Sequence, residues 1–138
     1  MSFAISLRVY YEDTDAGGIV YYANYLKFIE RARTEALLSL SLSQIDLRDR
    51  LGVLFAVRAV SADFLAPARL EDQLVVTAGV SRTAGSRIEM DQEVLRGGTL
   101  LVKCRVTLVC LSPSGRAARI PAEVREALAA LKTPDACP

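Results

Sequence analysis

The chain contains no histidine and only three cysteines among its 138 residues. Without histidine there is no Ser-His or Cys-His nucleophile pair, no imidazole base of the kind that dehydratases use, and no His-ligated zinc. The cysteines, among them Cys104 and Cys110, show no metal-ligand spacing, so we interpret them as small core residues and expect no metal site. If the protein is a catalyst, a carboxylate, tyrosine, lysine or backbone amide must do the chemistry.

Strong charge and long apolar runs are also missing. Seventeen basic and sixteen acidic residues leave a net charge of +1 without a run of one sign, which argues against a nucleic-acid partner. No apolar segment reaches the roughly 18 residues that span a bilayer, and the first residues, MSFAISLRVYYE, lack the basic and apolar regions of a signal peptide. We therefore expect a cytoplasmic protein without a membrane span. The hydrophobic fraction of 51% predicts a homo-oligomer that covers apolar surface.

The first part of the sequence predicts a strand, a loop and one long helix. Ile5 to Tyr11 is rich in β-branched and aromatic residues, which is typical of a strand. A helix is predicted from Asn24, a candidate N-cap, to about Leu40. Its buried face has helical spacing and consists of Tyr25, Phe28, Ile29, Ala32 and Ala36. A short helical turn is predicted over residues 44–52.

The second part alternates with the period of two that is typical of half-buried strands. A strand from Val53 to Phe64 precedes three more, whose inward positions are Leu74, Val76, Ala78 and Val80; Ile88, Met90, Gln92 and Val94; and Leu100, Val102, Cys104, Val106, Leu108 and Cys110. Turns are predicted over residues 83–86 and at Gly97-Gly98. A short helix is predicted over about 121–132, before a frayed tail at 133–138.

These elements predict one α+β domain over residues 1–138. A sheet with one apolar face needs a cover, and only one long helix is available to provide it. We therefore expect an antiparallel sheet wrapped around that helix. The sequence shows no internal repeat or linker that would indicate a second domain.

The loop between the first strand and the helix, EDTDAGGIVYYANY at residues 12–25, concentrates the candidate chemistry. A helix N-terminus presents unpaired N–H groups that can hold an oxyanion, and Asp15 lies seven residues before Tyr22, close to that end. A carboxylate beside such a site can attack an acyl carbon or activate water, and thioesters suit it because their thiolate leaves readily. Alternatively, Asp13 and Asp15 only cap turns beside the two glycines.

The run RVYYEDTDAGGIVYYANYLKFIERARTE, residues 8–35, resembles the signature of hotdog-fold acyl-CoA thioesterases of the 4-hydroxybenzoyl-CoA thioesterase type, particularly the Tol-Pal-associated, YbgC-like branch. The likeness continues through ADFLAPARLEDQLVV at residues 62–76. It implies a hotdog fold, a dimer with joined sheets or a tetramer, and active sites at the subunit interface. It also implies hydrolysis of acyl-CoA to free acid and CoA without a cofactor, with Asp15 as nucleophile or general base and the Tyr22 amide polarising the thioester carbonyl.

The loop, the start of the helix and one later strand contain candidate residues for contacting the substrate. Tyr22 stands where the Tol-Pal-associated branch commonly has histidine, and an aromatic residue there resembles the hydroxybenzoyl-CoA enzymes. The predicted substrate-binding residues are Gly18, Ile19, Tyr21, Tyr25 and Arg87. The tyrosines are candidates for an acyl pocket, although tyrosines beside a core helix more often pack, and an arginine suits the CoA phosphates.

Other carboxylates and other functions fit the sequence less well than this hypothesis. Glu30 and Glu35 on the helix, and Asp63 near a strand end, are weaker candidates for catalysis. A calcium loop starting at Asp13 fails, because it would place glycine and asparagine where oxygen-rich ligands are required. A phosphoaspartate hydrolase needs a parallel sheet, which the alternating strands disfavour. A non-catalytic hotdog module that binds CoA esters, acyl carrier or envelope proteins remains the alternative, and thiol release would separate it from an enzyme.

Overall fold

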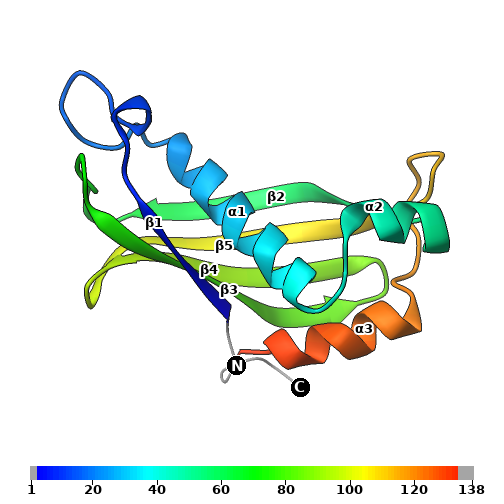
Figure 1. Ribbon diagram of the computed structural model, residues 1–138. Helices are drawn as coiled ribbons and strands as arrows, with labels where there is room; N and C mark the ends of the chain where they lie inside the picture. Colours follow the sequence, from blue (N-terminus) through cyan, green and yellow to red (C-terminus); the bar gives the residue numbers. More distant parts are fainter. Residues whose placement is uncertain (1–2, 134–138) are drawn as a thin grey trace.

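The computed structural model describes residues 3–133 and contains one five-stranded sheet, in the order β1-β3-β4-β5-β2 (Figure 1). The strands are β1 (Phe3–Arg8), β2 (Leu54–Phe64), β3 (Gln73–Ala84), β4 (Arg87–Arg96) and β5 (Thr99–Leu111). Every neighbouring pair is antiparallel. Tight turns at Gly85 and Gly97, both with positive φ, join β3 to β4 and β4 to β5.

One long helix, α1 (Asn24–Ser39), crosses one face of the sheet (Figure 1). Its buried side chains are the predicted ones with Leu37 in addition: Tyr25, Phe28, Ile29, Ala32, Ala36 and Leu37. The two alanines let the helix axis come close to the strands, and it packs mainly on β1, β3 and β4. The predicted α+β architecture, a hotdog-type sheet around one long helix, is confirmed.

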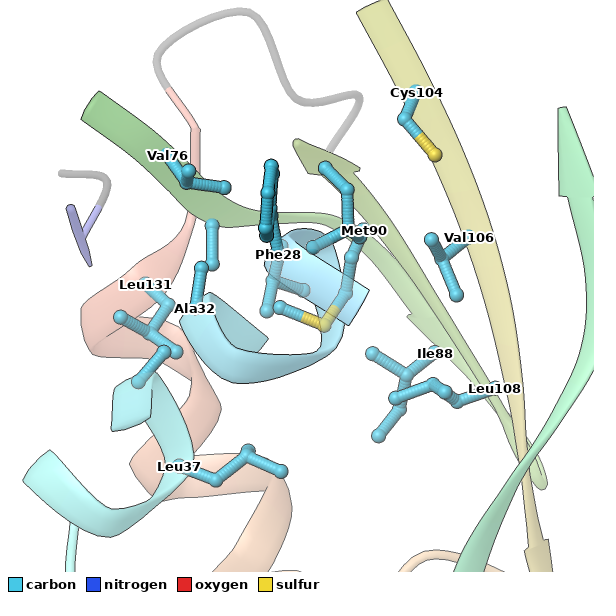
Figure 2. Close-up of a cluster of buried hydrophobic side chains, with 14 of the residues drawn as sticks. Phe28, Ala32, Leu37, Val76, Ile88, Met90, Cys104, Val106, Leu108 and Leu131 are labelled. Carbon is cyan, nitrogen blue, oxygen red and sulfur yellow. The ribbon is translucent and has the colours of Figure 1, made fainter. Parts of the chain in front are cut away.

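The core lies between α1 and the inward face of the sheet. Phe28 and Ala32 face the side chains of Val76 on β3 and Met90 on β4 (Figure 2). The inward positions of β3, β4 and β5 predicted from alternation are buried, apart from Leu100 at the start of β5, which is partly exposed. The period of two in the sequence therefore identified the covered face of the sheet.

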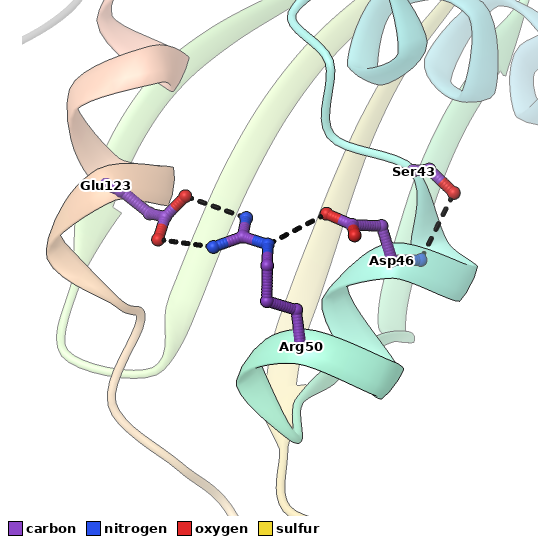
Figure 3. A network of polar contacts seen from close by, with 4 residues as sticks. All are labelled: Ser43, Asp46, Arg50 and Glu123. Atoms are coloured by element: carbon purple, nitrogen blue, oxygen red, sulfur yellow. Dashed lines mark hydrogen bonds and ion pairs between the residues drawn. The ribbon is translucent and has the colours of Figure 1, made fainter.

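Short helices cover the far end of the sheet from the α1 N-terminus (Figure 1). They are α2 (Gln44–Asp46), η2 (Leu47–Leu51), α3 (Ala122–Leu128) and η3 (Ala129–Leu131). The guanidinium of Arg50 on η2 donates two hydrogen bonds, of 2.9 and 2.8 Å, to the carboxylate of Glu123 on α3, and a third to Asp46 at 3.2 Å (Figure 3). This network links two helical segments that are far apart in sequence.

Two local predictions were wrong. The first strand ends at Arg8 rather than Tyr11, because Tyr11–Asp13 form a 3-10 turn, η1. Asn24 is not the N-cap of α1 but its first helical residue: Ala23 already has helical dihedrals, and an N-cap normally requires extended ones.

The last described residues form a short helix that packs near the end of β3. The short C-terminal helix predicted over about 121–132 is confirmed by α3 and η3. Most of the predicted frayed tail lies outside the described residues, but Thr133 donates its N–H to the carbonyl of Val80 on β3 at 2.9 Å. Within residues 3–133, the structure contains no helix that combines the length and apolar character needed to cross a membrane.

Candidate active site

A compact loop connects β1 to α1 and carries the predicted carboxylates. Thr14 and Val20 form an isolated antiparallel bridge. Inside it, the Asp15 N–H donates to the Ile19 carbonyl at 2.9 Å, and the Gly18 N–H donates to the Asp15 carbonyl at 3.0 Å. Gly18 has φ +76°, a backbone conformation that residues with a Cβ rarely adopt. The loop therefore presents Asp15 at a fixed turn.

The carboxylate of Asp15 is exposed and only half engaged. Its Oδ1 accepts a hydrogen bond from the Gly17 N–H at 2.8 Å. Its Oδ2 has no partner among residues 3–133. The turn thus orients the side chain through one oxygen and leaves the other available to a water molecule or a substrate.

Asp13 has a different environment and is only 8% exposed. Its Oδ2 accepts from the Tyr10 N–H at 2.8 Å and so caps the η1 turn. Its main-chain carbonyl accepts both from the Tyr21 N–H, at 3.0 Å, and from the side-chain amide of Asn24, at 2.9 Å. The turn-capping alternative therefore describes Asp13 fully. Asp15 also makes a turn contact, but its side chain is exposed.

The N-terminus of α1 offers two unpaired donors. The first hydrogen bond of the helical turn runs from the Asn24 N–H to the Tyr21 carbonyl, at 2.8 Å. The N–H groups of Tyr22 and Ala23 donate to no acceptor within the described part of the chain. They lie at the positive end of the helix dipole, where backbone amides commonly hold anions.

Aromatic side chains surround this helix end. The ring of Tyr22 lies 5.1 Å from that of Tyr21 and 5.8 Å from that of Phe64, the last residue of β2. Phe64 also contacts Tyr25, with ring centroids 5.8 Å apart. Tyr21, Tyr22 and Phe64 are exposed, so these rings form an apolar surface beside the free amides. Nothing in the local sequence of β2 indicated that Phe64 belongs here, since the contact spans about forty residues of chain.

Tyr25 lies in the core rather than on the surface, with 3% exposure. Its hydroxyl oxygen accepts the Ala68 N–H at 2.9 Å, and burial raises the pKa of its phenol above 10.0. The contact fastens the loop after β2 to the first turn of α1. Tyr25 therefore packs beneath the exposed aromatic side chains through its contact with Phe64.

The other predicted substrate-binding residues are divided between the two ends of the molecule. Gly18 and Ile19 are in the loop, where Ile19 bridges to Arg69. Arg87 pairs with Ala84 at the far end of β3, a strand of 12 residues. At about 3.3 Å per residue that strand is roughly 40 Å long, so one chain does not bring Arg87 to the loop.

The weaker carboxylate candidates are all exposed. Glu30 is exposed and accepts the Thr34 hydroxyl at 2.8 Å, as expected for a solvated helix residue. Glu35 is exposed further along α1. Asp63 is exposed on β2, in register with Lys103.

Residues 17–103 match the model of the thioesterase superfamily, which is well over half of the chain. The chain belongs to the thioesterase superfamily. It is 40% identical over 131 residues to the acyl-CoA thioesterase YbgC of Haemophilus influenzae, covering 94% of this chain and 96% of that relative. The family assignment makes this protein a thioesterase, as the resemblance in the sequence implied.

Solved structures with the same fold agree with this assignment. A probable thioesterase from Bartonella henselae superposes with a TM-score of 0.84 at 32% identity, covering 88% of this chain and all (100%) of that one. A 1,4-dihydroxy-2-naphthoyl-CoA thioesterase from Synechocystis superposes with a TM-score of 0.87 at 27% identity, covering 97% and 100%. Their hotdog-type architecture is therefore shared by this chain.

Proposed function

We propose that the protein hydrolyses acyl-CoA thioesters to the free acid and CoA, with Asp15 as the catalytic carboxylate and the Tyr22 N–H as the oxyanion donor. One structural relationship carries the proposal. The segment with the half-free Asp15 carboxylate is bonded, through the Thr14–Val20 bridge and the Asp13 carbonyl, to the segment with the unpaired amides. The proposal is supported by the similarity of the chain to the Haemophilus relative, which is an acyl-CoA thioesterase.

The chemistry needs no imidazole. The Tyr22 amide would stabilise the negative oxygen that forms when the thioester carbonyl is attacked. Asp15 would either attack the carbonyl carbon, giving a mixed anhydride that water then hydrolyses, or remove a proton from the attacking water. In both routes the C–S bond breaks and CoA leaves as a thiolate that takes up a proton. Water supplies the second oxygen of the acid in the general-base route. In the anhydride route, attack of water on the Asp15 carbonyl carbon leaves an Asp15 oxygen in the acid and the water oxygen in Asp15.

Substrate contacts would be shared between the two ends of the molecule. Gly18, Ile19 and Tyr21 lie beside the Asp15 turn and are suited to the thioester and acyl groups, with Tyr22 and Phe64 adding apolar surface. Arg87 lies too far away in the same chain. It could contact a CoA phosphate only at the site of a partner subunit.

We propose that a second copy of the chain joins along β2. This edge strand is 11 residues long, and its middle is exposed on both faces. Val57, Val60 and Phe64 are 48%, 44% and 47% exposed although they point to the helix side, in register with inward residues of β5. An open, apolar edge strand is a natural pairing surface, and Phe64 connects it to the Tyr22 site. The dimer would therefore cover the active site from one side.

The direct test is thiol release from short-chain, long-chain and aromatic CoA esters. Asp15→Asn keeps the shape of the side chain and should lower kcat by about 10²- to 10⁴-fold while the fold persists. Glu12→Gln, an exposed acid in the same loop, is the matched control and should retain activity. A single turnover in oxygen-labelled water separates the two routes, because only nucleophilic attack places label in the Asp15 carboxylate. Near-normal turnover by Asp15→Asn would exclude Asp15 as the catalytic group.

The same assay decides the alternative, a non-catalytic module. A module that only binds CoA esters, acyl carrier protein or proteins of the Tol-Pal envelope system would release no thiol above background from any ester. A cytoplasmic location would give either function access to the acyl-CoA pool.

A further inference from the structure

Gln92 is a fully buried amide at the centre of the interface between α1 and the sheet. It lies on the inward face of β4 between Met90 and Val94, and its exposure is 0%. Burying an amide among apolar side chains is unfavourable unless its donors and acceptor are all paired. An apolar residue of similar size would fill the same space without that cost. The presence of an amide at this position therefore needs an explanation.

Both ends of the Gln92 amide are held by one turn of α1. Its Nε2 donates to the main-chain carbonyl of Ile29 at 2.9 Å. Its Oε1 accepts from Nη1 of Arg33 at 3.2 Å. Ile29 and Arg33 are four residues apart and so lie above one another on the helix. The acceptor at one end and the donor at the other fix the orientation of the amide.

The sheet is adapted to hold this amide. The regular pairing between β3 and β4 is interrupted: Val76 pairs with Val94, and the next pair is Gly79 with Asp91. Residues 77 and 78 of β3 and residues 92 and 93 of β4 lie in this interruption. There the Glu93 N–H donates to the Thr77 hydroxyl at 2.9 Å. The Thr77 carbonyl accepts the second Nε2 hydrogen of Gln92 at 3.1 Å. Side chains thus replace regular ladder contacts where the helix crosses.

The remaining contacts in the middle of α1 are apolar and non-directional. Phe28, Ala32 and Ala36 pack against the sheet but do not define how far the helix lies along its own axis. The Gln92 amide does so, because a hydrogen bond fails after a small shift. Ile29 lies seven residues after Tyr22, about 10 Å along the helix, so a shift at one is transmitted to the other.

We propose that Gln92 is a positioning residue for the reaction: its amide sets the place of α1 on the sheet and so holds the Tyr22 N–H where the oxyanion forms. The inference rests on the proposed function. It concerns kcat and not substrate affinity, because Gln92 is buried and does not reach the surface where acyl-CoA would bind. Misplacement of a reacting group by about 1 Å can lower a rate by about 100-fold.

The test compares two variants from the two sides of this polar cluster. Gln92→Met keeps the length of the side chain and removes both hydrogen-bonding ends. Thr77→Val removes the contact with the Glu93 N–H but leaves the helix contact intact. Both should lower Tm. Only Gln92→Met should lower kcat, by about tenfold or more, with KM within about twofold of wild type. The hydrogen-bonded amides of residues 24–29 should then exchange hydrogen faster in Gln92→Met than in Thr77→Val.

Each outcome bears on the inference. If Gln92→Met is folded and keeps kcat within about twofold, or if Thr77→Val loses as much activity, Gln92 serves stability alone. If Gln92→Met does not fold, Gln92→Asn replaces it: this amide is one methylene shorter, so it should show the same loss of kcat. If the wild-type chain releases no thiol, the proposed function has failed instead, and hydrogen exchange still reports whether Gln92 holds the helix.

Discussion

The side-chain amide of Asn24 donates a 2.9 Å hydrogen bond to the main-chain carbonyl of Asp13, 11 residues earlier. This bond joins the turn that carries Asp15 to the first turn of α1. Asn24→Asp keeps the size of the side chain but removes the donor, while a carboxylate remains favourable at a helix N-terminus. We expect kcat to fall by about 10- to 100-fold with little change in Tm.

Thiol release and thermal unfolding of the same preparation check this prediction. Lys27→Gln, an exposed change on the same helix, is the control and should alter neither quantity. Retention of wild-type kcat by Asn24→Asp would show that the loop keeps its shape without the Asn24 bond.

The Asn24 contact also shows where sequence patterns stop being informative. Periods of 3.6 and 2 identified α1 and the inward strand faces, because burial acts on every turn of a helix and every second residue of a strand. The wrong assignment of Asn24 as an N-cap has a local cause. Residues 21–23 already form a turn, so the helix begins without an extended residue, and the Asn24 amide is used across the loop instead.

The candidate site was predictable only in part. Asp13 and Asp15 look alike in sequence, and each carboxylate accepts one hydrogen bond in its turn, but only the fold shows that Asp13 is buried while Asp15 is exposed. Phe64 and Gln92 act through contacts with distant segments. The alternation in the sequence correctly predicted that Gln92 faces inward. It could not predict that its amide forms hydrogen bonds with Ile29 and Arg33 on α1.

Substitutions at the adjacent Gly17 and Gly18 should have different effects. One should change the position of the Asp15 carboxylate, and the other should change the stability of the turn. A Cβ at Gly17 would meet Asp15 Oδ1 at 3.2 Å, so Gly17→Ala should displace the carboxylate and lower kcat by about tenfold. Gly18 has open space but φ +76°, so Gly18→Ala should lower the free energy of unfolding by about 1–2 kcal/mol. Kinetics and urea unfolding of both variants test the contrast. It would be refuted if Gly17→Ala lost stability and kept its rate.

The buried hydroxyl of Tyr25 should stabilise the fold at neutral pH, and this contribution should be lost at alkaline pH. Tyr25→Phe leaves the Ala68 N–H without its acceptor and should cost about 1–3 kcal/mol of unfolding free energy near neutral pH. Burial raises the phenol pKa above 10.0, so the unfolded chain loses the proton first. The stability that this group contributes is therefore fully present below about pH 10 and is lost as pH rises through the folded pKa.

Urea unfolding followed by circular dichroism at about pH 8 and about pH 11 measures this effect. The difference between wild type and Tyr25→Phe should narrow at the higher pH, since only the wild type has this buried phenol to ionise. An equal difference at both values would mean that Tyr25 ionises alike in the folded and unfolded chains.

The open edge at β2 predicts how assembly and activity are connected. Val60 is 44% exposed on the helix side of this strand, in register with the buried Val106 of β5. Val60→Lys would place a charge inside a joined sheet, so the mass measured by light scattering should fall from that of a dimer to that of a monomer. The folded monomer should persist, because the side chain is already partly in solvent.

The matched control is Ile45→Lys, which adds the same charge at an exposed apolar position on α2. It should keep both the mass and the rate of wild type. Thiol release by Val60→Lys should fall together with the mass, since Phe64 and Tyr22 lie next to the same edge and lose their cover from the partner. A Val60→Lys protein that remains dimeric would place the subunit contact elsewhere, and a fully active monomer would show that each chain carries a complete site.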